Sequence, residues 1–494
     1  MSELPDLSQL SHAQKDELIR QLFQTVQSLV GLVSQVDALQ KRIAELEARP
    51  RLNSRNSSKP PCSDGLAKAT SKPAPKSLRI PGQNPSGGQP GHSGNTLMQT
   101  AQPHEVIRHT SALNTSQCSV CSSTQLQHVV IERRQVFDLP VLRAQVTEHQ
   151  LIRSQCSCGA VHEGVFPAGI QAPTQYGPGV KALAVQLNQQ HFVPLQRTCE
   201  LLGDVFGLPL SQASLLAFTE QAAEHLAATV AAIGQAVQAA PVVHADESGI
   251  RVLGQLHWLH CVVTPTLTYL AHHAKRGAQA FDALGILGGV QGTLVHDGLL
   301  AYKNLECLHS LCNAHHLREL TYVHEQMGER VWDNWAKEMM ELLLQGKQEV
   351  DAHAGPLPAK RQAWFESQWS ELLLRGEAHH PQASRDDQLY STQRGRVAQS
   401  KAFNLLKRLR QYRQDVWRFA SDEGVPFTNN LAEQALRMSK VRQKVSGCFR
   451  TDAGATTFFT IRSYLQTMRK QQACLFDCLV SVFKGQPIQP SWAG

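Results

Sequence analysis

Two aspartates stand at the ends of short apolar runs that have the length and composition of β-strands. Asp246 closes Pro241–Asp246 (PVVHAD), and Asp297 closes Gly292–Asp297 (GTLVHD). Each run is apolar and then presents a carboxylate, as a buried strand does when it delivers an acid at its carboxyl end. One such aspartate is common in proteins. The repeated pattern makes these two acids candidates for a shared site.

The residues between the aspartates predict how the two acids meet. A β-rich stretch at Leu256–Val263, a second strand at Leu267–His272 and a helical piece at Ala278–Leu287 separate them. Three strands, a helix and a fourth strand is the order that opens a ribonuclease-H-like fold, in which the first and fourth strands lie side by side. Parallel neighbours need a long crossover, and 51 positions separate the acids (297 − 246). We therefore expect an α/β core that brings both aspartates together.

Two carboxylates this close repel each other unless cations lie between them, and Mg²⁺ or Mn²⁺ suits oxygen ligands. Two-metal phosphoryl chemistry needs a further carboxylate on an element that crosses the strand ends. Glu433, in the segment FTNNLAEQ, is the candidate. Asp246, Asp297 and Glu433 together predict a site for two Mg²⁺ or Mn²⁺ ions that acts on phosphodiester bonds.

Glu433 is predicted to lie on a helix with a cationic face, which Asn429 or Asn430 can cap. Arg437, Lys440 and Lys444 follow Glu433 by 4, 7 and 11 positions, and Arg442 adds a cation to the same segment. These four cations are candidates for holding DNA. The alternative is a capping box, Asn430-x-x-Glu433, with the cations on a solvated face.

Four cysteines predict one structural zinc ion. Cys118 and Cys121 have the usual C-x-x-C spacing, whereas Cys156 and Cys158 are one residue closer than usual. His162 is an alternative ligand, which leaves the fourth ligand open. The other interpretation is free cysteines in a hairpin.

A second metal-like spacing occurs in Cys312-Asn-Ala-His315, followed by Arg318 and Glu319. The sequence offers no second pair of ligands for it. A buried polar cluster of Cys312, His315 and Arg318 that supports the acidic site is therefore favoured over a zinc site, in which Cys312 and His315 would be ligands.

A heptad repeat occupies residues 18–46, with Leu or another aliphatic residue at almost every a and d position and Thr25 as the interruption. Four heptads separated by Gln, Lys and Glu favour a coiled coil, and hence a homo-oligomer, over a helix packed onto its own chain. Pro50 ends this helix. The residues that follow, to about 100, are rich in Ser, Pro, Gly, Asn and Lys, which is typical of a linker or a basic arm.

The composition suits a large folded protein with a polyanionic partner. The 494 residues are 42% hydrophobic and 18% charged, with a formal net charge of +7. Residues 401–450 contain eleven Lys or Arg and four acids, so this window carries the whole excess. The start of the chain lacks a signal-peptide pattern, and the most apolar stretch, 226–243, is broken by polar residues and a proline. We expect a cytoplasmic protein without a membrane span.

These patterns divide the chain into eight predicted regions. They are a coiled-coil oligomerisation helix (1–50), a basic linker (51–103), a zinc-binding domain (104–168), a helical region that binds DNA or connects domains (169–240), the first part of the core (241–313), a helical insertion (314–420), a catalytic helix with Glu433 (421–470) and a C-terminal tail (471–494).

Several stretches resemble the DDE transposases of the bacterial insertion sequence sixty-six family, and they occur in the expected order along nearly the whole chain. The matching stretches are Asn56–Pro61 with Ser63–Gly65, Gly87–His92, the four-cysteine segment, His244–Ser248, His296–Gly298, Cys312–Glu319, and Thr428–Glu433 running into Lys440–Gly447.

The resemblance implies an enzyme that binds the terminal inverted repeats of its element, hydrolyses the 3′ ends and joins them to target DNA. By motif position, Asp246, Asp297 and Glu433 map onto the acidic triad, and the four cysteines onto the zinc segment. Accessory proteins of the same element are implied as partners, and a location at the bacterial nucleoid follows.

Two other functions stay open. One is a catalytically silent DNA-binding regulator derived from a transposase, which the presence of all three acids disfavours. The other is a structure-selective nuclease with the same fold, which would cut branched DNA regardless of end sequence. The coiled coil and the zinc segment favour end recognition.

Overall fold

The computed structural model describes residues 11–12, 14–27, 29, 40, 98–109, 118, 120–125, 129–139, 142–327, 333–384 and 397–492. Two compact units contain them. The first comprises the described residues within Met1–Leu66, Tyr176–Thr198 and Gln212–Gly494, and the second those within Ala67–Gln175 and Cys199–Ser211. The linker motifs Asn56–Pro61 and Gly87–His92 lie outside the described residues.

The first unit is built on a mixed five-stranded sheet, whose strand order is β5-β4-β3-β6-β7. The β3–β4 and β4–β5 pairs are antiparallel, and the β3–β6 and β6–β7 pairs are parallel. The predicted adjacency of the first and fourth strands is therefore confirmed; β7 was not predicted. The strands are β3 (Val242–Val252), β4 (Gln255–Val263), β5 (Thr268–His273), β6 (Thr293–His296) and β7 (Leu308–Leu311).

β3 is longer than predicted. The expected strand ended at Asp246, but β3 continues to Val252 and pairs with β4 as far as Val252↔Gln255. Leu253 and Gly254 reverse the chain with φ of 52° and 76°, as a two-residue hairpin loop requires. Asp246 therefore lies in mid-strand, opposite Cys261 of β4.

The side chains of β3 alternate between two helical layers. Val243 and Ala245 pack in a core with α4 (Gln212–Gln238) and α5 (Ala278–Leu284). Ile250 and Val252 pack in another core with α11 (Asn430–Ser446) and α12 (Asp452–Lys470). Because successive residues of a strand face opposite sides, Asp246 belongs to the α11 face and the next residue to the α5 face.

Smaller elements complete the first unit around this sheet. The region 471–494, expected to be a tail, contains α13 (Leu475–Phe483), whose buried apolar residues pack against α2 and α4. The periodic run of Leu, Val and Phe in α13 explains this packing. The remaining elements are α2 (Pro178–Val185), the π-helix η3 (Gln186–Gln190), α3 (Leu195–Phe206), which spans both units, and the 3₁₀ turns η4 (Leu287–Gly289) and η5 (Tyr302–Asn304).

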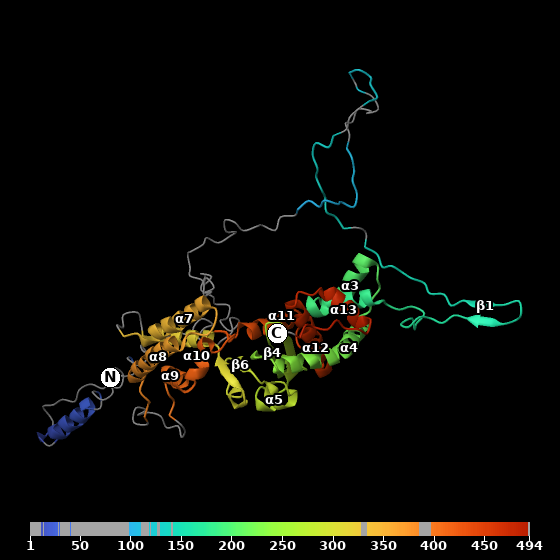
Figure 1. The fold of residues 1–494 in the computed structure, drawn as a ribbon. Coiled ribbons are helices and arrows are strands. Elements are labelled where there is room, and N and C mark those ends of the chain that lie inside the picture. The colour runs from blue at the N-terminus through green and yellow to red at the C-terminus, as the bar shows by residue number, and fades with distance from the viewer. Residues whose placement is uncertain are drawn as a thin grey trace. The chain divides into compact units, whose positions relative to one another are not determined.

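The region predicted as a helical insertion is helical. It has its own core around Trp335, Phe365 and Trp369, each almost fully buried, and α7 to α10 lie together in Figure 1. The helices are α6 (Asn313–Met327), α7 (Trp335–His353), α8 (Ala359–His379), α9 (Lys401–Gln411) and α10 (Arg413–Ser421).

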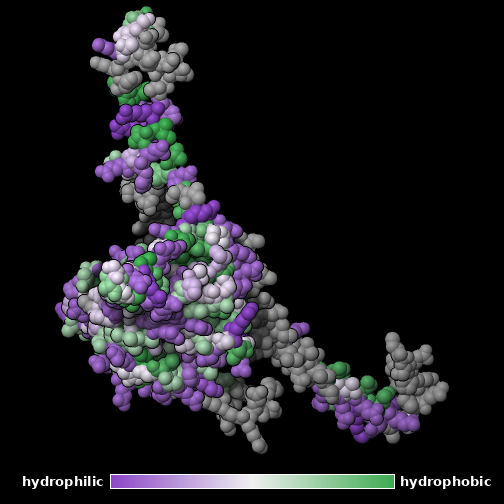
Figure 2. Space-filling model, turned by 90° about the vertical axis from the view of Figure 1, so that its right-hand side faces the viewer, coloured by the Kyte–Doolittle hydropathy of each residue, from purple (hydrophilic) through white to green (hydrophobic). Residues whose placement is uncertain are grey.

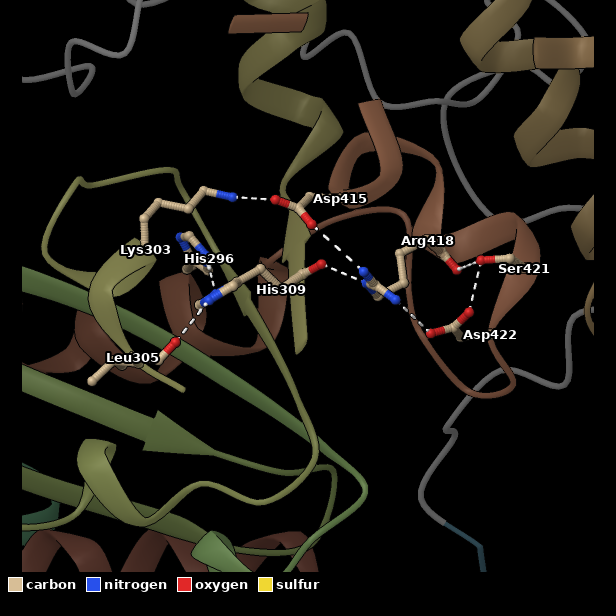
Figure 3. A network of polar contacts seen from close by, with 8 residues as sticks. All are labelled: His296, Lys303, Leu305, His309, Asp415, Arg418, Ser421 and Asp422. Atoms are coloured by element: carbon tan, nitrogen blue, oxygen red, sulfur yellow. Dashed lines mark hydrogen bonds and ion pairs between the residues drawn. The ribbon is translucent and has the colours of Figure 1, made fainter. Parts of the chain in front are cut away.

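A polar network joins this helical region to the sheet (Figure 3). The Arg418 guanidinium of α10 donates to the backbone oxygen of His309 in β7 at 2.6 Å and to Asp422 at 3.0 Å. Lys303 of η5 forms a buried ion pair with Asp415. Because these charges are paired and largely buried, the contact fixes α10 against the edge of the sheet.

The described part of the heptad region is helical over residues 14–27, with Leu22 and Phe23 more than half exposed. The heptad positions from Leu32 onward lie outside the described residues, and the coiled coil stays a prediction.

Among the described residues, the helices are all too short or too polar to cross a membrane. Figure 2 shows hydrophilic and hydrophobic residues interspersed on one face of the molecule.

Gly292→Ala should destabilise the first unit by about 1–3 kcal/mol, because a Cβ there would overlap the backbone oxygens of Ala240 and Pro241 where β3 and β6 begin to pair. The midpoint of urea unfolding measures the effect. Gly288→Ala is the matched control, since a Cβ at Gly288 meets no atom within 4 Å. Equal midpoints for the two variants would contradict the close approach.

Candidate active site

The register of β3 and β6 sets the two aspartates opposite each other. The parallel pairs Val242↔Thr293 and His244↔Val295 have a constant offset of 51 positions (293 − 242 and 295 − 244). Asp246 and Asp297 have the same offset, so continuing the register by two places aligns them. Asp297 directly follows the last residue of β6, as predicted.

Burial and neighbouring charge both act on Asp246. Burial and then the negative charges of Glu247 and Asp297, with a smaller contribution from Glu433, together raise the pKa of its carboxyl to about 8. A hydrogen bond from the backbone N–H of Glu247 to Asp246 Oδ1, at 2.8 Å, acts in the opposite direction. The structure therefore brings Asp297 and Glu433 within electrostatic reach of Asp246.

Two histidines hold the loop that carries Asp297. The backbone N–H of Gly298 donates to His296 Nδ1 at 3.0 Å, so the proton of that ring lies on Nε2, which donates to His309 Nδ1 at 3.2 Å. His309 Nε2 then donates to the Leu305 oxygen at 3.2 Å, as Figure 3 shows. Burial lowers the pKa of both rings, which favours this neutral chain. Asp297 Oδ1 accepts the N–H of Leu299 at 2.9 Å.

Asn429 places Glu433. Its amide nitrogen donates to the Ala245 oxygen at 2.7 Å, and its amide oxygen accepts from His244 Nδ1 at 2.9 Å. Its backbone N–H donates to Cys312 Sγ at 3.2 Å. Asn429 is 1% exposed, and its contacts fasten the first turn of α11 to β3.

The predicted cap is thereby corrected. Asn429 occupies the N-cap position of α11, but its side chain makes no capping hydrogen bond because it binds β3 instead. The capping-box alternative is also wrong, because Asn429 and not Asn430 occupies the N-cap position, and Glu433 Oε1 is buried without a hydrogen-bond partner in the described part of the chain. The available signal was an asparagine four positions before an acid, and it was interpreted as a cap.

Cys312 and His315 lie beside Glu433. Cys312 Sγ, one ring nitrogen of His315 and a carboxylate oxygen of Glu433 all lie within 4.8 Å of one another. Burial raises the pKa of the Cys312 thiol to about 11 and lowers that of His315, with the charge of Arg318 also lowering the latter. The structure thus gathers the predicted supporting cluster at the start of α6.

Glu247 is a site residue that the sequence pattern did not single out. Its side chain is fully buried and accepts two hydrogen bonds from Arg276, at 2.7 and 2.8 Å, and one from Tyr302 at 2.6 Å. Burial and then the charge of Asp297 raise its pKa. Alternation along β3 directs it to the α5 face, so the available signal was an acid that directly follows Asp246 in a buried strand.

The four cations proposed to hold DNA differ in their surroundings. Arg437 and Lys444 are exposed on α11. Lys440 Nζ donates to the Gly249 oxygen of β3. The Arg442 guanidinium lies 3.6 Å from the centre of the Phe449 ring, and burial lowers its pKa to about 10, so it stays charged at neutral pH.

In the second unit each cysteine pair lies in a tight turn. The N–H of Ser122 donates to the Cys118 oxygen at 2.9 Å, and the N–H of Gly159 donates to the Cys156 oxygen at 2.8 Å. The second turn joins β1 (Arg153–Gln155) to β2 (Val161–Glu163). Among the described residues, the sulfurs of the two pairs belong to no group of three ligands within 4.8 Å, so the shared zinc ion stays a prediction.

Asp246→Asn should raise the stability of the metal-free chain more at pH 8 than at pH 5. The folded chain holds a proton on Asp246 up to about pH 8, whereas the unfolded chain releases it near the ordinary pKa of 3.8. Wild-type stability therefore falls as the pH rises from about 4 to about 8, by at most about 1.4 kcal/mol per pH unit. Urea midpoints in chelator measure this.

The control for that measurement is Asp282→Asn, at an exposed aspartate of α5. The difference in unfolding stability between Asp282→Asn and the wild type should not grow with pH. A pH-independent difference for Asp246→Asn would show that Asp246 is an ordinary carboxylate.

Comparison with known families assigns the central part of the chain. The sequence profile described as "Transposase IS66 family" matches residues 173–457, which include β3 to β7 and α11, and a family of unknown function matches residues 2–98. No curated protein matches the chain. Since the first match covers more than half of the 494 residues, the chain belongs to the Transposase IS66 family.

Proposed function

We propose that the chain is a DDE transposase that cuts and joins DNA at the terminal inverted repeats of its element, with Asp246, Asp297 and Glu433 as the catalytic acids. The observation that carries the proposal is that the charges of Asp297 and Glu433 both act on Asp246, although the three acids come from β3, the end of β6 and α11. Family membership supplies the reaction class. The strand order and the two parallel pairs support a ribonuclease-H-like core.

The three acids fit divalent metal ions. Glu433 Oε1 is buried without a hydrogen-bond partner among the described residues. The pKa of Asp246 is raised by burial and by the negative charges of the acids around it. Both are properties of carboxylates that need a counter-ion, and oxygen-only ligands suit Mg²⁺ or Mn²⁺. When bound, two such ions would activate a water molecule or the 3′ hydroxyl of the DNA and would neutralise charge on the scissile phosphate.

The chain's own residues keep the acids in place for this chemistry. Pairing of β3 with both β4 and β6 fixes Asp246, and the neutral His296–His309 chain fixes the loop of Asp297. Asn429 bonds to β3 and thereby positions the first turn of α11, which carries Glu433. Cys312 and His315 lie beside the Glu433 carboxylate. Positioning of this kind contributes to rate because the reacting groups need no reorganisation.

DNA binding is assigned to the cationic residues of α11. Arg437 and Lys444 are exposed and can reach phosphate directly. The side chains of Lys440 and Arg442 contact Gly249 and Phe449, and they contribute positive charge from the same helix. The helical region 169–240 is a further candidate for end recognition.

The second unit is proposed to bind one structural Zn²⁺ through Cys118, Cys121, Cys156 and Cys158. The proposal is supported by its lack of a core: between positions 98 and 175, no described residue is buried, and Ile131 and Val136 are at least 90% exposed. A small domain without a hydrophobic core needs another source of stability, such as a structural metal ion. Oligomerisation through the heptads at residues 18–46, and cooperation with accessory proteins of the element, complete the proposal.

Asp297→Ala should reduce Mg²⁺-dependent cleavage of element-end DNA by on the order of a thousand-fold or more, because one proposed ligand of the metal ions is removed. Binding to the same DNA should change little. Cleavage is measured on labelled end DNA with the accessory partners present, and binding by mobility shift.

Asp282→Asn, an exposed acid on α5, is the matched control and should cleave like the wild type. Retained cleavage by Asp297→Ala would overturn the catalytic assignment. A wild-type chain that binds ends but cuts nothing with Mg²⁺ or Mn²⁺ would support the silent regulator. Equal cutting of branched DNA of any sequence would support a nuclease.

The double variant Arg437→Gln, Lys444→Gln should bind end DNA with a weaker dependence on salt. Each lost phosphate contact lowers the slope of log K against log salt by about 0.9, so the slope should become less steep by about 2. Fluorescence anisotropy at several salt concentrations measures it. Lys360→Gln, on α8, is the control and should leave the slope unchanged. An unchanged slope in the double variant would exclude α11 from the DNA interface.

A further inference from the structure

A second cluster of metal-ligating side chains lies away from the three acids. His257 of β4, His272 of β5 and Asp452 of α12 each offer one ligand atom, and these atoms all lie within 4.8 Å of one another. The imidazole rings are 5.8 Å apart between centres, and His272 Nδ1 lies 3.9 Å from Asp452 Oδ1. This separation is too long for a hydrogen bond.

The strand register directs both histidines to one face of the sheet. His272 is paired with Leu259 in the antiparallel β4–β5 ladder, and His257 precedes Leu259 by two positions. Side chains two apart on a strand share a face, so His257 and His272 are diagonal neighbours on the side covered by α12. His273 is paired with Trp258 and belongs to the opposite face.

The hydrogen bonds of Thr456 fix the protonation of His272. The Thr456 hydroxyl donates its single proton to the Asp452 backbone oxygen at 3.2 Å. Its 3.2 Å contact with His272 Nε2 must therefore be an N–H donated by the ring, which leaves a lone pair on Nδ1. This is the outer contact that orients a metal-binding histidine.

Two buried ring nitrogens of this cluster have no hydrogen-bond partner within the described residues. They are His257 Nδ1 and His272 Nδ1. Two imidazole nitrogens and a carboxylate oxygen are ligands of borderline divalent ions such as Zn²⁺, whereas Mg²⁺ prefers oxygen alone. We propose that His257, His272 and Asp452 bind one zinc-class ion, which clips the first turn of α12 to the β4–β5 hairpin.

A metal ion at this site would stabilise the helical layer of α11 and α12, in which α11 carries Glu433. α12 follows α11 after a short loop and packs on β5, where the N–H groups of Thr268 and Leu270 donate to Thr467 and Ser463. An ion at the first turn of α12 would fix the other end of the same helix–strand contact. The predicted effect is greater stability with zinc, independent of DNA.

The test compares zinc binding by chelator-treated full-length variants. Zn²⁺ is titrated in competition with a chromophoric chelator, and the ions bound per chain are counted. His257→Ala and His272→Ala should each bind one ion fewer than the wild type and lose part of its zinc-dependent rise in Tm. His273→Ala, the neighbour on the opposite face, is the matched control and should behave like the wild type.

Asp452→Asn keeps the test decisive if a histidine variant fails to fold, because the Asp452 side chain is 67% exposed. It should weaken this one site at least about tenfold. The four cysteines and the three acids are unchanged in every variant, so their metal content cancels in the comparison. Equal zinc content and equal Tm gain in the wild type and these variants would overturn the site.

Discussion

Repulsion between carboxylates at the boundary of β3 and β6 is the interaction on which the rest of the site depends. Asp246, Glu247 and Asp297 bring three carboxyl groups to a partly buried place, where burial and the charges of the other two raise the pKa of Asp246 to about 8. Such an arrangement persists only if the backbone cannot relax. β3 is paired on both sides, and a shift of one residue would send every side chain of the strand to the wrong face.

The histidines that lie close to the two aspartates in the sequence fix this geometry without neutralising it. His244 and His296 precede the two aspartates by two positions and one position, and burial lowers the pKa of both, that of His244 to about 4. Neutral rings can donate and accept hydrogen bonds while adding no positive charge. Arg276 is committed to Glu247 on the opposite face. The acids proposed to bind metal ions therefore receive no positive charge from these histidines.

The sequence predicted what depends on local pattern. Apolar runs located β3 to β6 but not β7, Ala- and Leu-rich periodicity located the helical regions, and the distance of 51 positions between two similar runs led to the β3–β6 pair. The sequence could not predict that Asp246 lies in mid-strand, because the length of β3 depends on how many of its residues pair with β4. Nor could it predict the role of Asn429, whose partners His244 and Ala245 lie 185 and 184 positions earlier. The bond from Tyr302 to Glu247 is likewise a tertiary contact without a local signal.

The bond between Asn429 and β3 also sets an order of events during protein synthesis. A ribosome delivers β3, β6 and the helices of the insertion before it delivers α11, and domains generally fold from the N-terminal side. Contacts that span so many residues form late. A nascent chain, or one cut short by a premature stop codon within the insertion, contains both aspartates but lacks Glu433. The acidic set is therefore completed only in a chain whose translation has passed α11.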